Sequence, residues 1–197
     1  LRPDLPELVA YAEELGMVSG VLSSGWRITE LEYMYSILNA GLDHLMIILD
    51  ADDESAWEAL RDTLAEDLFV SVHLTISPHN KGRINELIEK LAQQQVKALS
   101  LSISDLSLKD ELVRARDLAA HHQLPLIWDI PVPYSAMNPV ALELQSVEEA
   151  PSGAGRAWLY VEPDGDVLPG QGIQQVLGNL LNDPFEIIWE KAKKFTE

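Results

Sequence analysis

The sequence predicts an α/β fold built on parallel strands, and three observations support this prediction. Short apolar segments alternate about five times with segments of helical periodicity, joined by short loops. The segment 45–49 is apolar on both faces, as a central strand of a parallel sheet usually is. Helices between successive strands allow right-handed crossovers, which connect parallel neighbours. The order of elements therefore indicates a parallel sheet covered by helices.

The predicted elements follow one another regularly along the first two thirds of the chain. We expect strands at residues 18–22, 45–49, 68–77, 97–104 and 124–130, and helices at residues 8–15, 29–39, 56–65, 83–94 and 108–122. Asp4 caps the first helix, with Pro6 in its first turn. Thr29 and Glu32 form a capping box at the start of the second helix. Asp52, Asp53 and Glu54 crowd the start of the third, where the helix dipole favours negative charge.

The length of this repeat leaves two architectures open. A complete eight-stranded TIM barrel takes about 250 residues, whereas the helix–strand repeats here occupy about 130. The repeats therefore form either an open sheet or a partial TIM-like parallel barrel. In the second case the first strands would precede Leu1, and the exposed edge of the sheet would favour self-association.

Two successive predicted strands carry polar side chains on one face. The alternation is strict in residues 68–77 and is repeated in residues 97–104. The polar residues of this face are Ser71, His73, Thr75 and Ser77 in the first strand and Ser100, Ser102 and Ser104 in the second. Because parallel strands are normally apolar on both faces, a shared polar side indicates a ligand-holding cavity. The alternative is that small serines fill the tight centre of a barrel.

The last third of the chain has a different pattern. Residues 136–155 combine weak periodicity with several prolines and glycines, as expected of a linker. Residues 156–167 predict a β-hairpin that turns at Pro163-Asp164-Gly165. Asp183 and Pro184 then begin a final helix. We therefore predict an α/β domain, a linker, and a C-terminal β-hairpin with a helix, at residues 1–135, 136–155 and 156–197.

Composition excludes several classes of function. The net charge of −18 disfavours binding to nucleic acid and to anionic membrane surfaces. No apolar run approaches the roughly 20 residues that span a bilayer, so we expect a cytoplasmic protein. The absence of cysteine excludes a cysteine nucleophile, thiolate zinc sites and cysteine-held iron–sulfur clusters within these residues.

The C-terminal hairpin resembles a known family. Residues 160–169, with the sequence YVEPDGDVLP, are followed by Gly178-Asn179 and by a helix that contains Ile188-Trp189. This order resembles the SPASM or twitch extension of radical S-adenosylmethionine (radical SAM) enzymes, which reads roughly PDGxVxPC, then GN, then IW.

The N-terminal part resembles the same family in the same order. Leu1-Arg2-Pro3-Asp4-Leu5 is similar to the residues after the family's GGEP motif, and Ser23-Ser24-Gly25 stands where relatives carry TNG. Leu49-Asp50 stands within the place of SLDG, and Asn80 matches an asparagine after the following strand. The resemblance implies reductive cleavage of S-adenosylmethionine and hydrogen abstraction from an unknown substrate.

Three departures from the family pattern limit this interpretation. The CxxxCxxC loop that holds the family's 4Fe-4S cluster would precede Leu1 and is absent from these residues. Gly170 stands in the place of the first auxiliary-cluster cysteine, and Ile48 replaces the serine of SLDG. The chain as given is therefore expected to be inactive in radical chemistry, whereas a parent protein would carry one 4Fe-4S cluster.

The resemblance and the strand pattern together select the candidate site residues. The candidates for binding S-adenosylmethionine are Ser24, Asp50, His73, Thr75 and Asn80. The candidates for binding the small-molecule substrate are Ser102, Ser104, Asp105 and Asp129. Most have a structural alternative: the carboxylates and the asparagine can cap turns, and an inward histidine can be a satisfied core residue. The sequence indicates no catalytic residue.

Other classes of function have weaker support. The histidines and acids lack HxH or HExxH spacing, which disfavours a metal hydrolase, and no metal ligand is assigned. Neither GxSxG nor GxGxxG is present, which disfavours a serine hydrolase and a dinucleotide enzyme. The alternatives to a radical SAM fragment are a non-catalytic small-molecule-binding module and an acidic interaction scaffold, both derived from the same barrel.

Overall fold

The computed structural model describes residues 3–127, 153–162, 164–170, 173 and 175–195. It contains two compact units, Leu1–Pro139 and Val140–Glu197, and each is described by itself.

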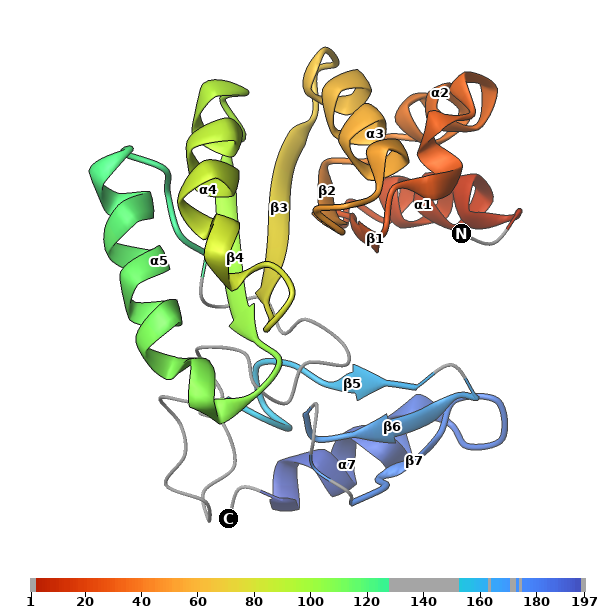
Figure 1. Cartoon of the computed structure of the whole chain (residues 1–197). Helices are drawn as coiled ribbons and strands as arrows, with labels where there is room; N and C mark the ends of the chain where they lie inside the picture. The colour runs from red at the N-terminus through yellow and green to blue at the C-terminus, as the bar shows by residue number, and fades with distance from the viewer. Residues whose placement is uncertain (1–2, 128–152, 163, 171–172, 174, 196–197) are drawn as a thin grey trace. The chain divides into compact units, whose positions relative to one another are not determined.

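The first unit is an α/β unit whose four parallel strands are neighbours in chain order. The strands are β1 (Gly20–Ser23), β2 (His44–Ile48), β3 (Phe69–Ile76) and β4 (Ala98–Ile103), in the sheet order β1-β2-β3-β4 (Figure 1). Because each strand pairs with the next one along the chain, the order in which strands are added across the sheet never reverses. Right-handed crossovers then bring all connecting helices to one face, as in a singly wound sheet. The predicted parallel α/β fold is confirmed.

Within residues 3–127, five helices accompany this sheet. They are α1 (Leu5–Glu14), α2 (Leu31–Asn39), α3 (Glu54–Leu64), α4 (Ile84–Gln93) and α5 (Lys109–His121). Single 3₁₀ turns, η1 (Trp26–Thr29), η2 (Lys81–Arg83) and η3 (Leu106–Leu108), follow strands β1, β3 and β4.

The acidic start of α3 is confirmed, the start of α1 is confirmed in position but not in the predicted capping bond, and the predicted capping box of α2 is wrong. Asp53 caps α3, since its carboxylate accepts a hydrogen bond from Ser55 N at 2.9 Å, and Pro6 lies in the first turn of α1. Asp4 stands at the cap position of α1 without a side-chain bond to the helix. Thr29 does not cap α2, because it ends η1 instead, where its hydroxyl donates to the carbonyl oxygen of Trp26 at 2.9 Å.

A glycine accounts for the 3₁₀ turn that displaces the predicted cap. Gly25 has a φ of +86°, and a Cβ there would lie 2.8 Å from the Cβ of Ala59. The chain leaves β1 in this left-handed conformation and makes one tight turn, so α2 starts after Glu30, one residue beyond Thr29.

One face of the sheet forms the main apolar core with the helices. The apolar side chains that strands and helices turn toward each other are fully buried. From the strands these are Leu45, Ile47, Val70, Val72, Leu74, Ile76, Leu99, Leu101 and Ile103, and from α3 and α4 they are Leu60, Leu87, Ile88 and Leu91. Each such side chain stabilises the fold by about 1.5–3 kcal/mol relative to exposure. Trp57 is also buried; its indole Nε1 donates to Ala51 O at 3.1 Å, and the Nζ of Lys90 lies 3.5 Å from the centroid of its ring.

The fifth predicted strand is seen only at its start. Leu126 forms a parallel bridge with Leu99, supported by hydrogen bonds from Leu99 N to Pro125 O at 2.7 Å and from Ile127 N to Leu99 O at 2.9 Å. Residues 128–130 of that predicted strand lie outside the described residues. The described sheet therefore has four strands, with a single bridge beside β4.

The second unit is a small antiparallel sheet with a helix. Its strands are β5 (Tyr160–Val161), β6 (Asp166–Leu168) and β7 (Gly178–Asn179), in the order β5-β6-β7, and its helix is α7 (Phe185–Phe195). The predicted hairpin turns through Gly165, whose φ is +93°. A core of Val167, Leu177, Ile188 and Ala192 joins the sheet to α7. Most of the predicted linker lies outside the described residues; its end, residues 153–155, hydrogen-bonds within this unit.

None of the described helices has both the length and the hydropathy that a membrane span requires.

Candidate ligand site on the polar face of the sheet

The register of β3 and β4 brings the predicted polar side chains together. His73 is opposite Ser100, and Thr75 is opposite Ser102. Paired residues of neighbouring strands point to the same side of a sheet. Since the intervening Val72, Leu74 and their partners face the helices, these four polar side chains lie on the other face.

The four side chains form one hydrogen-bonded network, called the His73 network below. The His73 Nδ1 lies 2.9 Å from the Ser100 Oγ, and the His73 Nε2 lies 3.0 Å from the Ser102 Oγ and 3.2 Å from the Thr75 Oγ1. The hydroxyl oxygens of Thr75 and Ser102 are 3.0 Å apart. Every member therefore has a partner within the network.

The His73 network is buried except at one residue. His73 is 1% exposed, Ser100 4% and Ser102 0%, whereas Thr75 is partly exposed. Burial lowers the pKa of the His73 imidazole to about 4, because a charged ring would lose its hydration there. The imidazole is therefore neutral at pH 7, with one ring nitrogen as a donor and the other as an acceptor.

This arrangement bears on the two interpretations that the sequence left open. The serines do not simply fill space, because Ser100 and Ser102 bond to the imidazole. The network also holds together without a ligand, since every member has at least one partner within it. A ligand on this face would therefore meet the network at Thr75, its most exposed member.

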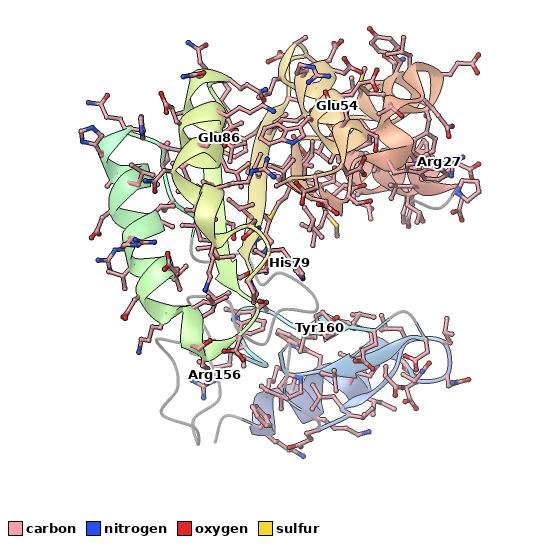
Figure 2. The ribbon with its side chains drawn as sticks, viewed as in Figure 1. Arg27, Glu54, His79, Glu86, Arg156 and Tyr160 are labelled. Atoms are coloured by element: carbon pink, nitrogen blue, oxygen red, sulfur yellow. The ribbon has the colours of Figure 1, made fainter. Side chains whose placement is uncertain are left out.

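Asn80 organises the loop that follows β3, next to Thr75. Its side-chain oxygen accepts from Ser77 N at 2.8 Å, and its side-chain nitrogen donates to Thr75 O at 2.8 Å. The same loop carries His79 as an exposed side chain at the carboxyl end of β3 (Figure 2). Asn80 thus bridges the loop, which is the structural role that the sequence allowed for it.

The two candidate carboxylates that the structure describes also make local bonds. Asp50, after β2, accepts from Asp52 N at 3.0 Å, and Asp105, after β4, accepts from Ser107 N at 2.8 Å. The hydrogen bonds from Ser107 lower the pKa of the Asp105 carboxyl. Both side chains cap turns while remaining exposed at the carboxyl edge of the sheet.

The remaining candidates are less well placed for one site. Ser24 is exposed after β1, and it is its neighbour Ser23 that is buried and accepts from Gly25 N at 3.0 Å. Ser104 is exposed beyond the end of β4, whereas Ser102 is buried. Asp129 lies outside the described residues. The structure therefore joins His73, Thr75 and Ser102 directly and leaves Ser24, Asp50, Asn80, Ser104 and Asp105 along the same edge.

Sequence reasoning missed a connection across this edge. Arg83 Nη1 lies 2.6 Å from Asp52 Oδ1, so an ion pair links the loop after β2 to the turn after β3. From the sequence, Asp52 had only the role of a helix-start charge, and its partner 31 residues away gave no local signal.

Sequence reasoning also missed an apolar pocket at the other end of the sheet. The pocket has a volume of about 270 Å³ at the amino ends of β1 to β3. Residues on its floor include Gly20, Leu22, His44, Met46, Phe69 and Ser71. The rings of His44 and Phe69 are 5.1 Å apart between centroids. These positions continue the face of the His73 network, but here apolar side chains such as Leu22, Met46 and Phe69 predominate.

The residues of this chain do not fit an iron–sulfur cluster. The sequence contains no cysteine, and no group of three His, Asp or Glu side chains within the described residues is arranged to hold a metal ion. A Cβ at Gly170 would lie 2.7 Å from the ring of Trp158, so a cysteine there would require that ring to move.

The fold and this site define the class of the chain as an α/β protein whose four-stranded parallel sheet carries polar side chains at the carboxyl ends of its strands. A scan against models of known protein families gives no match.

Proposed function

We propose that this chain is part of a radical SAM enzyme, with the first unit as part of a partial TIM-like barrel and the second as a cysteine-free, twitch-like extension. The observation that carries the proposal is the His73 network, which lies on the face of the sheet opposite the helices described between β1 and β4. In such sheets, ligands bind at the carboxyl ends of the strands. Thr75, Asn80, Asp50 and Asp105 belong to that edge.

The charge of the chain supports the choice of ligand. S-adenosylmethionine carries a sulfonium, an ammonium and a carboxylate, and therefore has a net positive charge at neutral pH. A protein with a net charge of −18 attracts a cationic ligand over long range. Asp50 and Asp105 add exposed carboxylates at the proposed site.

The proposal gives these residues a role in binding rather than in radical formation. In the parent reaction, reductive cleavage of S-adenosylmethionine generates a radical that abstracts hydrogen from a substrate, which we leave unassigned. Here the side chains of β3 and β4 would orient the ligand and exclude water. Ser102, Ser104, Asp105 and Asp129 remain candidates for the substrate side. We propose a cytoplasmic location and a small-molecule substrate, with neither nucleic acid nor membrane as a partner.

A non-catalytic binding module is the second candidate function. It is favoured by the absence of cysteine from the sequence and by a polar network in which every member has a partner without a ligand. The gene decides between the two candidates. Codons for CxxxCxxC before the codon for Leu1 would support the enzyme, whereas a natural start codon at this point would support the binding module.

Thermal unfolding in the presence of S-adenosylmethionine distinguishes both candidates, which would bind this ligand, from an interaction scaffold, which would not. At a concentration 100 times the dissociation constant, a ligand of the folded state stabilises it by about 2.7 kcal/mol. For a chain of this size the midpoint then rises by roughly 5 to 10 °C. An unchanged midpoint at millimolar S-adenosylmethionine would contradict the proposal and favour an interaction scaffold.

A further inference from the structure

The His73 network has one more donor than its internal contacts can use at one time, and this surplus donor can be located. A neutral imidazole contributes one N–H, and the three hydroxyls contribute one O–H each. The Nε2, Thr75 and Ser102 atoms form a triangle, which can hold two directed hydrogen bonds in sequence, and the Nδ1–Ser100 contact holds a third. One hydroxyl proton therefore has no acceptor inside the network.

The tautomer of His73 decides which hydroxyl carries this surplus proton. With the proton on Nδ1, the ring donates to Ser100, and the Ser100 hydroxyl proton is left over at a residue that is 4% exposed. Within residues 3–127, we find no acceptor for Ser100 Oγ other than Nδ1. A buried donor without an acceptor costs about 1–3 kcal/mol, so this tautomer is disfavoured.

With the proton on Nε2, all the buried donors are satisfied. Ser100 donates to Nδ1, the ring N–H donates to Ser102 along the shorter of its two contacts, and Ser102 donates to Thr75. The surplus proton is then on Thr75, the partly exposed member.

We propose that the His73 network is a directed chain of donors, Ser100 to His73 to Ser102 to Thr75, which presents the Thr75 hydroxyl proton to an oxygen acceptor of a bound small molecule. This inference rests on the proposed function and deepens it. The group recognised is a carbonyl, carboxylate, ether or hydroxyl oxygen. A ligand that offers only donors at this point, such as an ammonium group, would leave the Thr75 proton unpaired.

The tautomer can be measured without any ligand. Two-bond ¹H–¹⁵N correlation spectra of the folded chain distinguish protonated from bare ring nitrogens. We expect a neutral His73 ring at pH 7 with its proton on Nε2. A proton on Nδ1, or on both nitrogens, would overturn the direction of the chain of donors.

The role of Thr75 is measured by titration with S-adenosylmethionine. Thr75→Val keeps the shape of the side chain and removes the hydroxyl, and we expect about tenfold weaker binding. Thr75→Ser keeps the donor and should bind within about threefold of the natural chain, and the circular dichroism and midpoint of each variant show whether it folds.

The two failures are distinguishable. Equal binding by the natural chain and by folded Thr75→Val would overturn the role of Thr75 and leave the proposed function standing. If the natural chain does not bind S-adenosylmethionine, the proposed function and the ligand assignment both fail, whereas the spectra still decide the direction of the network.

Discussion

At the scale of single residues, the most informative side chain is a buried histidine whose hydrogen-bond partners among the described residues are all uncharged. The neighbours that His73 contacts are hydroxyls, so nothing in the network stabilises an imidazolium. Its position was predictable, because strict alternation in residues 68–77 places it with Ser71 and Thr75. The identity of its partners was not, since the match of His73 to Ser100 depends on a register that the local pattern leaves open.

The lowered pKa of His73 predicts a specific loss of stability in acid. The folded pKa of about 4 lies below the ordinary value of 6.5, so the unfolded chain binds the proton more readily. The contribution is complete above pH 6.5 and is lost as the pH falls towards 4, by about 3 kcal/mol. Urea unfolding at pH 7 and pH 4 measures it, with His73→Gln as the control. An equal loss in both proteins would contradict the prediction, because all other groups are shared.

Gly25 provides a second prediction at this scale. Its φ of +86° and the 2.8 Å approach to the Ala59 Cβ make Gly25→Ala both strained and crowded. We expect a cost of about 1–3 kcal/mol in urea unfolding. Gly82→Ala is the matched control, because no heavy atom lies within 4 Å of its added Cβ. Similar effects at the two positions would show that the turn after β1 is not constrained in this way.

At the scale of elements, strands were predicted better than helix starts. Each strand carries its own period-2 or fully apolar signal, and four of the five predicted strands are found as a parallel sheet in chain order. The Thr29–Glu32 pattern matched a capping box, yet a 3₁₀ turn occupies that place. The signal for the turn was Gly25, whose close approach to α3 is a tertiary contact that the sequence does not display.

Asp53 and Thr29 give a prediction that compares a helix cap seen in the structure with one expected only from the sequence motif. Asp53→Ala removes the hydrogen bonds from Ser55 at the start of α3 and should cost about 1 kcal/mol. Thr29→Ala removes an exposed hydroxyl that caps no α-helix and should cost less than about 0.5 kcal/mol. Chemical denaturation of both variants checks this order. A larger loss of unfolding free energy for Thr29→Ala than for Asp53→Ala would contradict this order and would indicate that Thr29 caps α2.

At the scale of the whole chain, the first unit has an edge that a further strand could extend. In the described residues, β1 pairs only with β2. Met17 and Val18, just before β1, are 57% and 74% exposed. An open parallel edge beside apolar side chains favours pairing with another chain. The sequence predicted such an edge from the length of the repeat, but it could not locate the ion pair between Asp52 and Arg83 or the apolar pocket near His44, which depend on packing between distant segments.

We predict that the chain self-associates through this edge. Val18→Lys places a charge beside β1 and should shift the chain to monomers in sedimentation at concentrations where the natural chain forms dimers. Leu181→Lys makes the same change of charge at a residue that is 78% exposed in the second unit, and it should leave the dimer intact. A monomeric natural chain, or equal effects of both variants, would contradict the prediction.

The polar edge of the sheet as a ligand site is tested most directly by mapping amide shifts during titration with S-adenosylmethionine. The account predicts that the largest changes occur at Thr75, Asn80 and Ser102, with small changes at His44 and Phe69 at the opposite ends of the strands. Changes centred on His44 and Phe69, or spectra that do not change at all, would contradict it.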